Sequence, residues 1–259
     1  LENIIINKVE FVVALGTTGE ASTLSHEEQQ IVIETIKKTV NERIPVFIGI
    51  GGNNTHKMVQ TINETNFNGL TGILSVSPYY NLPNQRGLYE HYSAIAKASP
   101  VPIIIYNIPG RTGSNVSADT ILALAKQHWN ISAVKEASGN FKQIMKLLRN
   151  KPDDFSVLAG DDALTYPMMA LGADGVISVI ANAYPAAFSG MVRLMMKKKF
   201  DEKTLKNAAF CRDQCPGCTK GRQKGRGLMY QLMKIERLFC PYCRAYEKVY
   251  GVRVYEEAV

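Results

Sequence analysis

The sequence predicts an α/β protein of the (β/α)8 barrel class, and three observations support this prediction. Short apolar runs alternate with amphipathic segments at fairly even spacing along most of the chain. The runs are apolar throughout, as is typical of parallel strands that are covered by helices. Polar and glycine-rich residues follow nearly every run, and in a barrel these positions meet at one rim. No dinucleotide-binding fingerprint follows any run.

The apolar runs predict seven strand–helix units in order. The expected strands cover 11–15, 45–50, 72–76, 102–105, 131–134, 155–158 and 175–179. Residues 1–9 resemble the end of an amphipathic helix, and Ser25 with Glu28 forms a capping box that starts the next helix. Further helices are expected after residue 55 and over about 87–98, 117–127, 140–149, 163–171 and 183–199.

Composition divides the chain into two parts. Of its 259 residues, 46% are hydrophobic, and no apolar run approaches the ~18 residues needed to cross a bilayer. The start shows no signal-peptide pattern, and it lacks Met, so we expect that the natural protein begins earlier. The formal charge of +7 is uneven, with +2 over 1–199 and +5 over 200–259, and all five cysteines lie in the second part. We therefore expect a catalytic domain over 1–199 and an atypical basic segment over 200–259.

Lys135 is the residue from which the chemistry can be argued. It follows the β-branched run 131–134, so it is expected at the end of a buried strand. Burial disfavours a lysine cation, and a neutral amine can attack a carbonyl carbon. Taken alone, such a lysine more commonly extends from a strand end to solvent.

The residues at the strand ends, taken together, decide between these two interpretations. The motifs are Gly16-Thr17-Thr18-Gly19-Glu20, Pro78-Tyr79-Tyr80-Asn81, Tyr106-Asn107-Ile108-Pro109-Gly110-Arg111-Thr112-Gly113 and Val134-Lys135-Glu136-Ala137-Ser138-Gly139. As a set, over about residues 5 to 199, they resemble the class I aldolases of the dihydrodipicolinate synthase and N-acetylneuraminate lyase superfamily. The last two motifs resemble the dihydrodipicolinate synthase branch.

The resemblance implies a barrel enzyme of lysine and diaminopimelate biosynthesis in the cytoplasm. It would join pyruvate to L-aspartate 4-semialdehyde, giving 4-hydroxy-tetrahydrodipicolinate, with no metal and no cofactor beyond a Schiff base on Lys135. The resemblance makes Tyr106 the proton shuttle and Thr17 and Tyr80 its partners in a hydroxyl relay. Tyr80 would reach into a neighbouring subunit's site, so a homo-oligomer, a dimer of dimers in the family, is expected. Membrane and nucleic-acid partners are not expected.

The resemblance also implies how the substrates are held. The backbone N–H groups of Thr17 and Thr18 are suited to the pyruvate carboxylate, and Arg111 can grip the carboxylate of the semialdehyde through two parallel hydrogen bonds. Gly160 and Ile177 match positions whose backbone lines the lysine pocket. Individually, these tyrosines, threonines and the arginine more often have structural roles, and Asp161 and Asp162 are expected to cap the following helix.

Two questions stay open within this framework, namely the enzyme class and the regulation by lysine. A sialic acid or keto-deoxy-sugar aldolase would share the lysine and the tyrosine, although Arg111 and Glu136 favour the synthase. Tyr79, Asn53 and His26 match the family's regulatory pocket. Lys57 there replaces an acid found in lysine-sensitive members, so weak or absent inhibition by lysine is expected.

The chain departs from the family at both ends. The first strand of the family is missing, and a barrel without it has two open edges and cannot close. Beyond about residue 200 the chain becomes cysteine-rich and poorly periodic, and Cys215, Cys218, Cys240 and Cys243 have the spacing of a four-thiolate zinc site. Residues 220–226 are basic and would suit phosphate contacts.

Three interpretations of this tail remain. It is a zinc ribbon that binds nucleic acid, a pair of disulfides, which a cytoplasmic enzyme rarely has, or a segment outside the evolved enzyme such as an out-of-frame translation. The third interpretation is favoured, because family residues are missing at both ends. An inactive fragment that keeps the site residues is the corresponding alternative for the whole chain.

Overall fold

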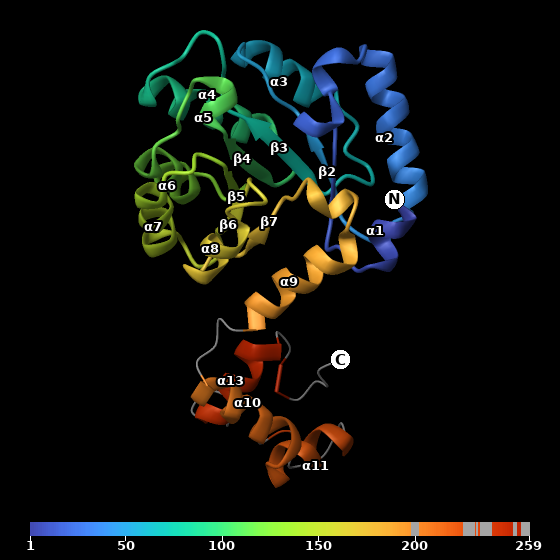
Figure 1. Ribbon diagram of the computed structural model, residues 1–259, viewed down its shortest axis with the longest axis vertical. Helices are drawn as coiled ribbons and strands as arrows, with labels where there is room; N and C mark the ends of the chain where they lie inside the picture. Colours follow the sequence, from blue (N-terminus) through green and yellow to red (C-terminus); the bar gives the residue numbers. More distant parts are fainter. Residues whose placement is uncertain (198–201, 225–230, 232, 234–239, 251–252, 255–259) are drawn as a thin grey trace. The chain divides into compact units, whose positions relative to one another are not determined.

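The computed structural model describes residues 1–197, 202–224, 231, 233, 240–250 and 253–254. The chain divides into two units, Leu1–Met196 and Lys197–Val259. The first unit is built on a parallel sheet whose strands follow each other in chain order, from β1 to β7 (Figure 1). The strands are β1 (Val12–Ala14), β2 (Val46–Gly49), β3 (Gly72–Val76), β4 (Ile103–Asn107), β5 (Ile131–Glu136), β6 (Ser156–Ala159) and β7 (Gly175–Val176).

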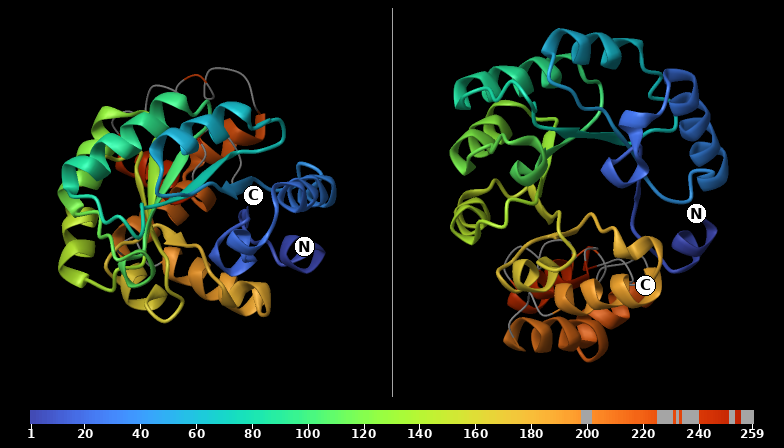
Figure 2. Two further views of the ribbon diagram at one scale, coloured as in Figure 1. Left: turned by 90° about the horizontal axis from the view of Figure 1, so that it is seen from above. Right: turned by 45° about the horizontal axis from the view of Figure 1, so that its top comes forward.

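Helices follow the strands and cover the outer face of this curled sheet, as Figure 2 shows from two further directions. They are α1 (Glu2–Ile6), α2 (His26–Val40), α3 (Thr55–Glu64), α4 (Gln85–Ala98), α5 (Pro109–Thr112), α6 (Ala118–Gln127), α7 (Phe141–Asn150), α8 (Thr165–Ala170) and α9 (Pro185–Lys197), with the 3-10 turns η1 (Thr17–Gly19), η2 (Ala21–Thr23) and η3 (Ile180–Asn182). The seven expected units are therefore confirmed.

The capping box at the start of α2 is confirmed too, because Ser25 Oγ accepts from the Glu28 N–H while the Glu28 carboxylate accepts from the Ser25 N–H at 2.7 Å.

Two apolar cores lie on the two faces of the sheet. The larger core fills the space between strands and helices, where Ile105, Val134 and Val157 are fully buried. The smaller core fills the concave face with the alternate residues of the same strands, which include Ile104 and Ala133. Because side chains alternate across a strand, both faces of each strand must be apolar, and this explains the continuous apolar runs in the sequence.

The expected incomplete barrel is observed. In the described residues β1 pairs only with β2, and β7 pairs only with β6, so the sheet is open between its first and last strands. A cavity of about 820 Å³ extends to this opening and is lined there by Val12, Val13 and Val176 of the edge strands.

Some expected elements end earlier in the structure. The first helix stops at Ile6, before the left-handed Lys8 at φ 59°, and β7 covers two residues instead of five. The Asp162 carboxylate takes the Val179 and Ile180 N–H groups, and η3 begins there in place of further strand. The expectation that Asp162 caps α8 is therefore wrong, because that carboxylate caps the turn after β7.

The second unit is helical in its described residues, with α10 (Glu202–Asp213), α11 (Pro216–Lys224) and α13 (Pro241–Tyr250). A zinc ribbon is a β structure, so the ribbon prediction is wrong for these residues. Part of the basic stretch 220–226 lies outside the described residues. No helix in the described residues is both long and apolar enough to cross a membrane.

We predict that Gly72→Ala destabilises the first unit by about 1–3 kcal/mol, as overpacking in a core does. A Cβ at this position in β3 would lie 2.5 Å from Phe47 Cε1 and 2.6 Å from the Pro102 carbonyl oxygen. Chemical denaturation measures the effect. Gly190→Ala in α9 is the matched control, because its Cβ meets nothing within 4 Å and alanine favours a helix by about 1 kcal/mol. Equal effects of the two substitutions would contradict this packing of β3.

Candidate active site

The side chain of Lys135 points into the concave face of the sheet. Along β5 the side chains alternate, so Ala133 and Lys135 share the concave face while Val134 and Glu136 face the helices. Lys135 is 8% exposed and lines the cavity. Burial lowers the pKa of its amine to about 8, against an opposing effect of the Asp162 carboxylate. About a tenth of the amine is therefore neutral at pH 7, far more than for a lysine with the ordinary pKa.

Tyr106 is the direct neighbour of Lys135 across the sheet. The two residues are register partners in β4 and β5, and Lys135 Nζ lies 4.3 Å from the centroid of the Tyr106 ring. Burial raises the pKa of the Tyr106 phenol, while a hydrogen bond with Thr17 and the charge of Arg111 lower it. The phenol therefore stays protonated at neutral pH and is placed to exchange a proton with a group bound to Nζ.

The turn after β1 forms the opposite wall of the cavity. Gly16, Thr17 and Thr18 line it, and η1 begins at Thr17. The first N–H groups of such a turn have no partner within the turn itself. Because Thr17 and Thr18 line the cavity, their N–H groups are candidate hydrogen-bond donors to an anionic group placed there.

Three other predicted residues also line this cavity, namely Arg111, Gly160 and Ile177. Arg111 lies in α5, and its positive charge lowers the pKa of the Tyr106 phenol. At Gly160 a Cβ would lie 2.7 Å from the Ala137 Cβ and 3.1 Å from the Lys135 Cγ. Glycine is therefore required there, because a side chain would displace the lysine.

Tyr80 is not among the residues that line this cavity in its own chain. Its side chain is 90% exposed, and its backbone has φ of 73°, a left-handed conformation. The loop is fixed by Asn53, whose Nδ2 donates to the Tyr79 carbonyl at 3.2 Å and whose carbonyl accepts from Asn81 Nδ2 at 3.1 Å. The loop thus presents the ring of Tyr80 outward in a defined position.

A buried polar network on the other face of β4 and β5 supports Tyr106 and Lys135. The next residues along each strand, Asn107 and Glu136, are also register partners, and Glu136 is 1% exposed. Asn107 Nδ2 donates to Glu136 Oε2 at 3.0 Å, and the Ser138 N–H donates to Glu136 Oε1 at 2.7 Å. Asn107 Oδ1 accepts from the Val116 N–H at 2.9 Å. These hydrogen bonds connect the ends of β4 and β5 and so hold Tyr106 and Lys135 in register.

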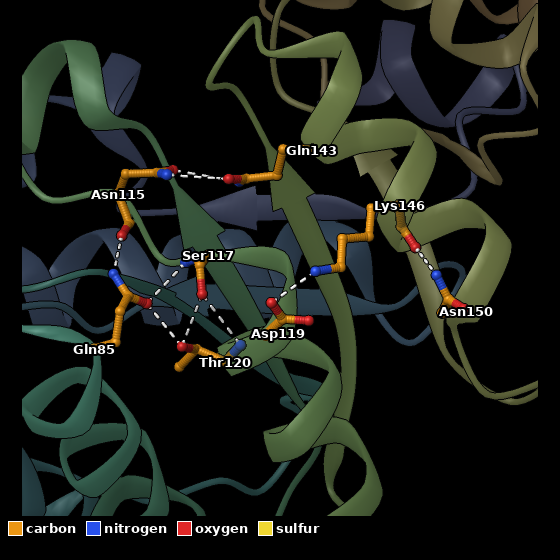
Figure 3. Close-up of polar contacts among 8 residues, drawn as sticks. All are labelled: Gln85, Asn115, Ser117, Asp119, Thr120, Gln143, Lys146 and Asn150. Carbon is orange, nitrogen blue, oxygen red and sulfur yellow. Dashed lines mark hydrogen bonds and ion pairs between the residues drawn. The ribbon is translucent and has the colours of Figure 1, made fainter.

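The network continues outward through helices α4, α6 and α7 (Figure 3). Gln143 of α7 donates to Glu136 Oε2 at 3.1 Å and exchanges hydrogen bonds with Asn115. Gln85 of α4 donates to the Asn115 carbonyl at 2.8 Å and accepts from the Ser117 N–H at 3.0 Å. The supporting role of Asn107 was not predicted from the sequence, although a polar residue beside Tyr106 at the end of an apolar run was the available signal.

Asp162 is a second residue whose role the sequence did not reveal. Its Oδ2 caps η3, while Oδ1 is buried without a hydrogen-bond partner among the described residues. It lines the cavity, and its charge acts on the Lys135 amine. The nearest charge that favours the protonated form of the lysine therefore comes from the loop after β6.

Comparison with known proteins places this arrangement in a family. The model of the Dihydrodipicolinate synthetase family matches residues 2–212. The 4-hydroxy-tetrahydrodipicolinate synthase of Flavobacterium psychrophilum is 51% identical over 194 residues, which are 75% of this chain and 66% of that protein. The synthase of Parabacteroides distasonis is 50% identical over 195 residues, with the same two coverages. The crystal structure of dihydrodipicolinate synthase from Aquifex aeolicus has a TM-score of 0.71 at 35% identity and covers 92% of this chain and 89% of that one. The chain thus spans slightly less than two thirds of the length of these two curated relatives.

We predict that Asp162→Asn lowers the pKa of Lys135 further, because the substitution removes the negative charge that stabilises the ammonium form. The amide oxygen can still accept the two N–H groups of η3. A pH titration of the lysine side chain followed by NMR measures the change. Asp161→Asn is the matched control, since Asp161 is exposed and does not contribute to this shift. An unchanged or higher pKa in Asp162→Asn would contradict the assignment.

We predict that Asn107→Ala lowers the free energy of unfolding by about 2–3 kcal/mol, because it removes one donor from the buried Glu136 carboxylate and leaves the buried Val116 N–H without its acceptor. The exposed Asn115→Ala variant should lose less than about 1 kcal/mol. Denaturant titration of both proteins tests the difference. If both variants are equally stable, the network does not anchor the strand ends.

Proposed function

The chain belongs to the dihydrodipicolinate synthetase family, and on this basis we propose that it is a 4-hydroxy-tetrahydrodipicolinate synthase. It condenses pyruvate with L-aspartate 4-semialdehyde, a step of lysine and diaminopimelate biosynthesis in the cytoplasm. The observation that carries the proposal is the buried Lys135 amine, with its lowered pKa, beside the Tyr106 ring in a cavity large enough for two small acids.

The reaction begins with attack of Lys135 Nζ on the ketone carbon of pyruvate. The resulting carbinolamine loses water, and a protonated imine remains on the lysine. A methyl proton then leaves, because the iminium nitrogen accepts the electron pair, and an enamine forms. The enamine carbon attacks the aldehyde carbon of the second substrate and forms the new carbon–carbon bond. The amino group of the semialdehyde finally displaces Lys135 from the imine, closes the ring and releases the free amine.

Each proton transfer in this sequence needs a donor or acceptor next to Nζ. Tyr106 is the group in contact with Lys135, and its hydrogen bond to Thr17 continues the path away from the amine. Tyr80 of a neighbouring copy would complete the relay, and its outward position on a fixed loop supports this part of the proposal. We therefore propose that the active form is a homo-oligomer that contains at least this pair of subunits.

The substrate carboxylates have separate partners in the proposed complex. The N–H groups of Thr17 and Thr18 would hold the pyruvate carboxylate close to the imine, and Arg111 would hold that of the semialdehyde. Gly160 and Ile177 line the pocket around the lysine without adding a polar side chain. Arg111 therefore favours an acidic aldehyde over the polyhydroxylated aldehydes of the sugar-type aldolases.

We predict that borohydride reduction in the presence of pyruvate links one pyruvate to Lys135. Peptide mass mapping identifies the labelled residue. Lys135→Ala should abolish the label, whereas substitution of the exposed Lys142 should leave it unchanged.

The pH dependence of this labelling follows from the pKa of Lys135. Only the neutral amine attacks, so the rate of imine formation should rise with pH, reach half its maximum near pH 8 and level off about one pH unit above that. No label in a folded protein would support the inactive fragment in place of the synthase, and labelling at another lysine would overturn the assignment of the nucleophile.

A further inference from the structure

The second unit contains a cluster of thiols that the proposed reaction does not use. The sulfur atoms of Cys211, Cys218 and Cys243 all lie within 4.8 Å of one another, and all three residues are buried. They come from α10, α11 and α13, so the cluster joins all three described helices of this unit. Cys218 Sγ and Cys243 Sγ are 3.6 Å apart.

A fourth thiol lies beside this group. Cys215 and Cys240 are both partly buried against the same core, and Cys215 is the one whose thiol interacts with Cys218, although it is outside the group of three whose sulfurs all lie within 4.8 Å of one another. The resulting set is Cys211, Cys215, Cys218 and Cys243, and it differs from the set expected from spacing, which had Cys240 in place of Cys211. Spacing did not indicate Cys211, because the approach of this α10 residue to the thiols of α11 and α13 depends on how the three helices pack.

The spacing of the sulfurs fits one metal ion. A tetrahedral zinc ion with Zn–S bonds of about 2.3 Å holds its four sulfurs about 3.8 Å apart. A disulfide needs sulfurs about 2.05 Å apart, so this cluster is not a pair of closed disulfides. An iron–sulfur cube would hold its cysteine sulfurs farther apart than a single ion does. The three clustered thiols fit three positions around such an ion, Cys215 is the candidate for the fourth, and soft thiolate ligands favour zinc.

The surroundings of the cluster suit thiolates. Cys218 and Cys243 lie near the N-termini of α11 and α13, where the helix dipole favours negative charge. Arg222 donates to the Cys211 carbonyl at 2.7 Å, hydrogen-bonds its thiol, and lies over the Tyr246 ring. A cation therefore stands beside the sulfurs to offset the charge of four thiolates.

The small core of this unit gives a reason for a metal. Among its described residues the fully buried core consists of Cys211, Cys218, Met233, Cys243, Tyr246 and Val254. In a unit of this size a structural metal adds stability that a small apolar core supplies only in part. Half of this core is thiol, and a bound ion would tie the three helices together.

From these observations we propose that Cys211, Cys215, Cys218 and Cys243 form a structural zinc site in the second unit. Binding replaces the proton on each thiol by a sulfur–zinc bond and releases the protons to solvent, with no change of oxidation state. The site does not depend on the proposed synthase activity and would stand if that activity were absent.

Zinc content of the full chain is the first test. Protein produced with zinc in the medium should carry one zinc per chain by plasma mass spectrometry. Cys218→Ser should lose the metal, Cys215→Ser should bind it at least tenfold more weakly, and Cys240→Ser should keep it. Absence of zinc, its retention in Cys218→Ser, or its loss in Cys240→Ser would each overturn the site.

A second test uses the unsubstituted chain and does not depend on how a variant folds. Alkylation should label Cys240 alone in the zinc-loaded protein, and a chelator should expose the other four thiols and reduce the helical circular dichroism. Cobalt added to the metal-free chain should give the intense spectrum of tetrahedral thiolate coordination. Equal alkylation with and without chelator, or an intact mass that shows a disulfide, would contradict the proposal.

Discussion

Withdrawal of the Lys135 amine from water is the constraint on which the active-site geometry depends. Lowering the pKa from 10.5 to about 8 makes the protonated amine cost the folded state about 3 kcal/mol below pH 8. This cost diminishes as the pH rises from 8 towards 10.5, because the folded chain holds its proton less tightly than the unfolded chain does. The apolar strands on both sides hold the side chain in place, and the Asn107–Glu136 network fixes the strand ends behind it. Burial thus lowers the stability of the folded state and raises the neutral fraction of the amine that we propose as the nucleophile.

Much of the first unit could be predicted from the sequence for physical reasons. Parallel strands under helices must be apolar on both faces, so the strands could be recognised as continuous apolar runs in the sequence. The strand order follows because each strand pairs with the next one along the chain. Most residues predicted for the site line one cavity, because the polar ends of such strands meet at one rim. Asp162 was misassigned because a carboxylate near a helix start has the same sequence signal whether it caps that helix or a turn 17 residues later. The support by Asn107 was missed because the contact partner, Glu136, is distant in sequence and close only through strand pairing.

The second unit shows where sequence patterns stop being sufficient. Its cysteine spacing indicated a metal site of the ribbon type, whereas the described residues are helical and bring Cys211 into the cluster. A prediction from cysteine spacing assumes that each Cys-x2-Cys pair lies in one local turn, whereas helix packing can bring together cysteines that are distant in sequence. The open edges of the sheet show the opposite case, because counting the expected strands was enough to predict that β1 and β7 would not pair.

The most direct measurement of the central claim is a crystal structure of the protein treated with pyruvate. The account predicts a continuous bond between Lys135 Nζ and the former ketone carbon, with the Tyr106 hydroxyl about 2.6–3.2 Å from the reacting centre. Pyruvate bound without this bond, or a Lys135 side chain turned out of the concave face, would contradict it.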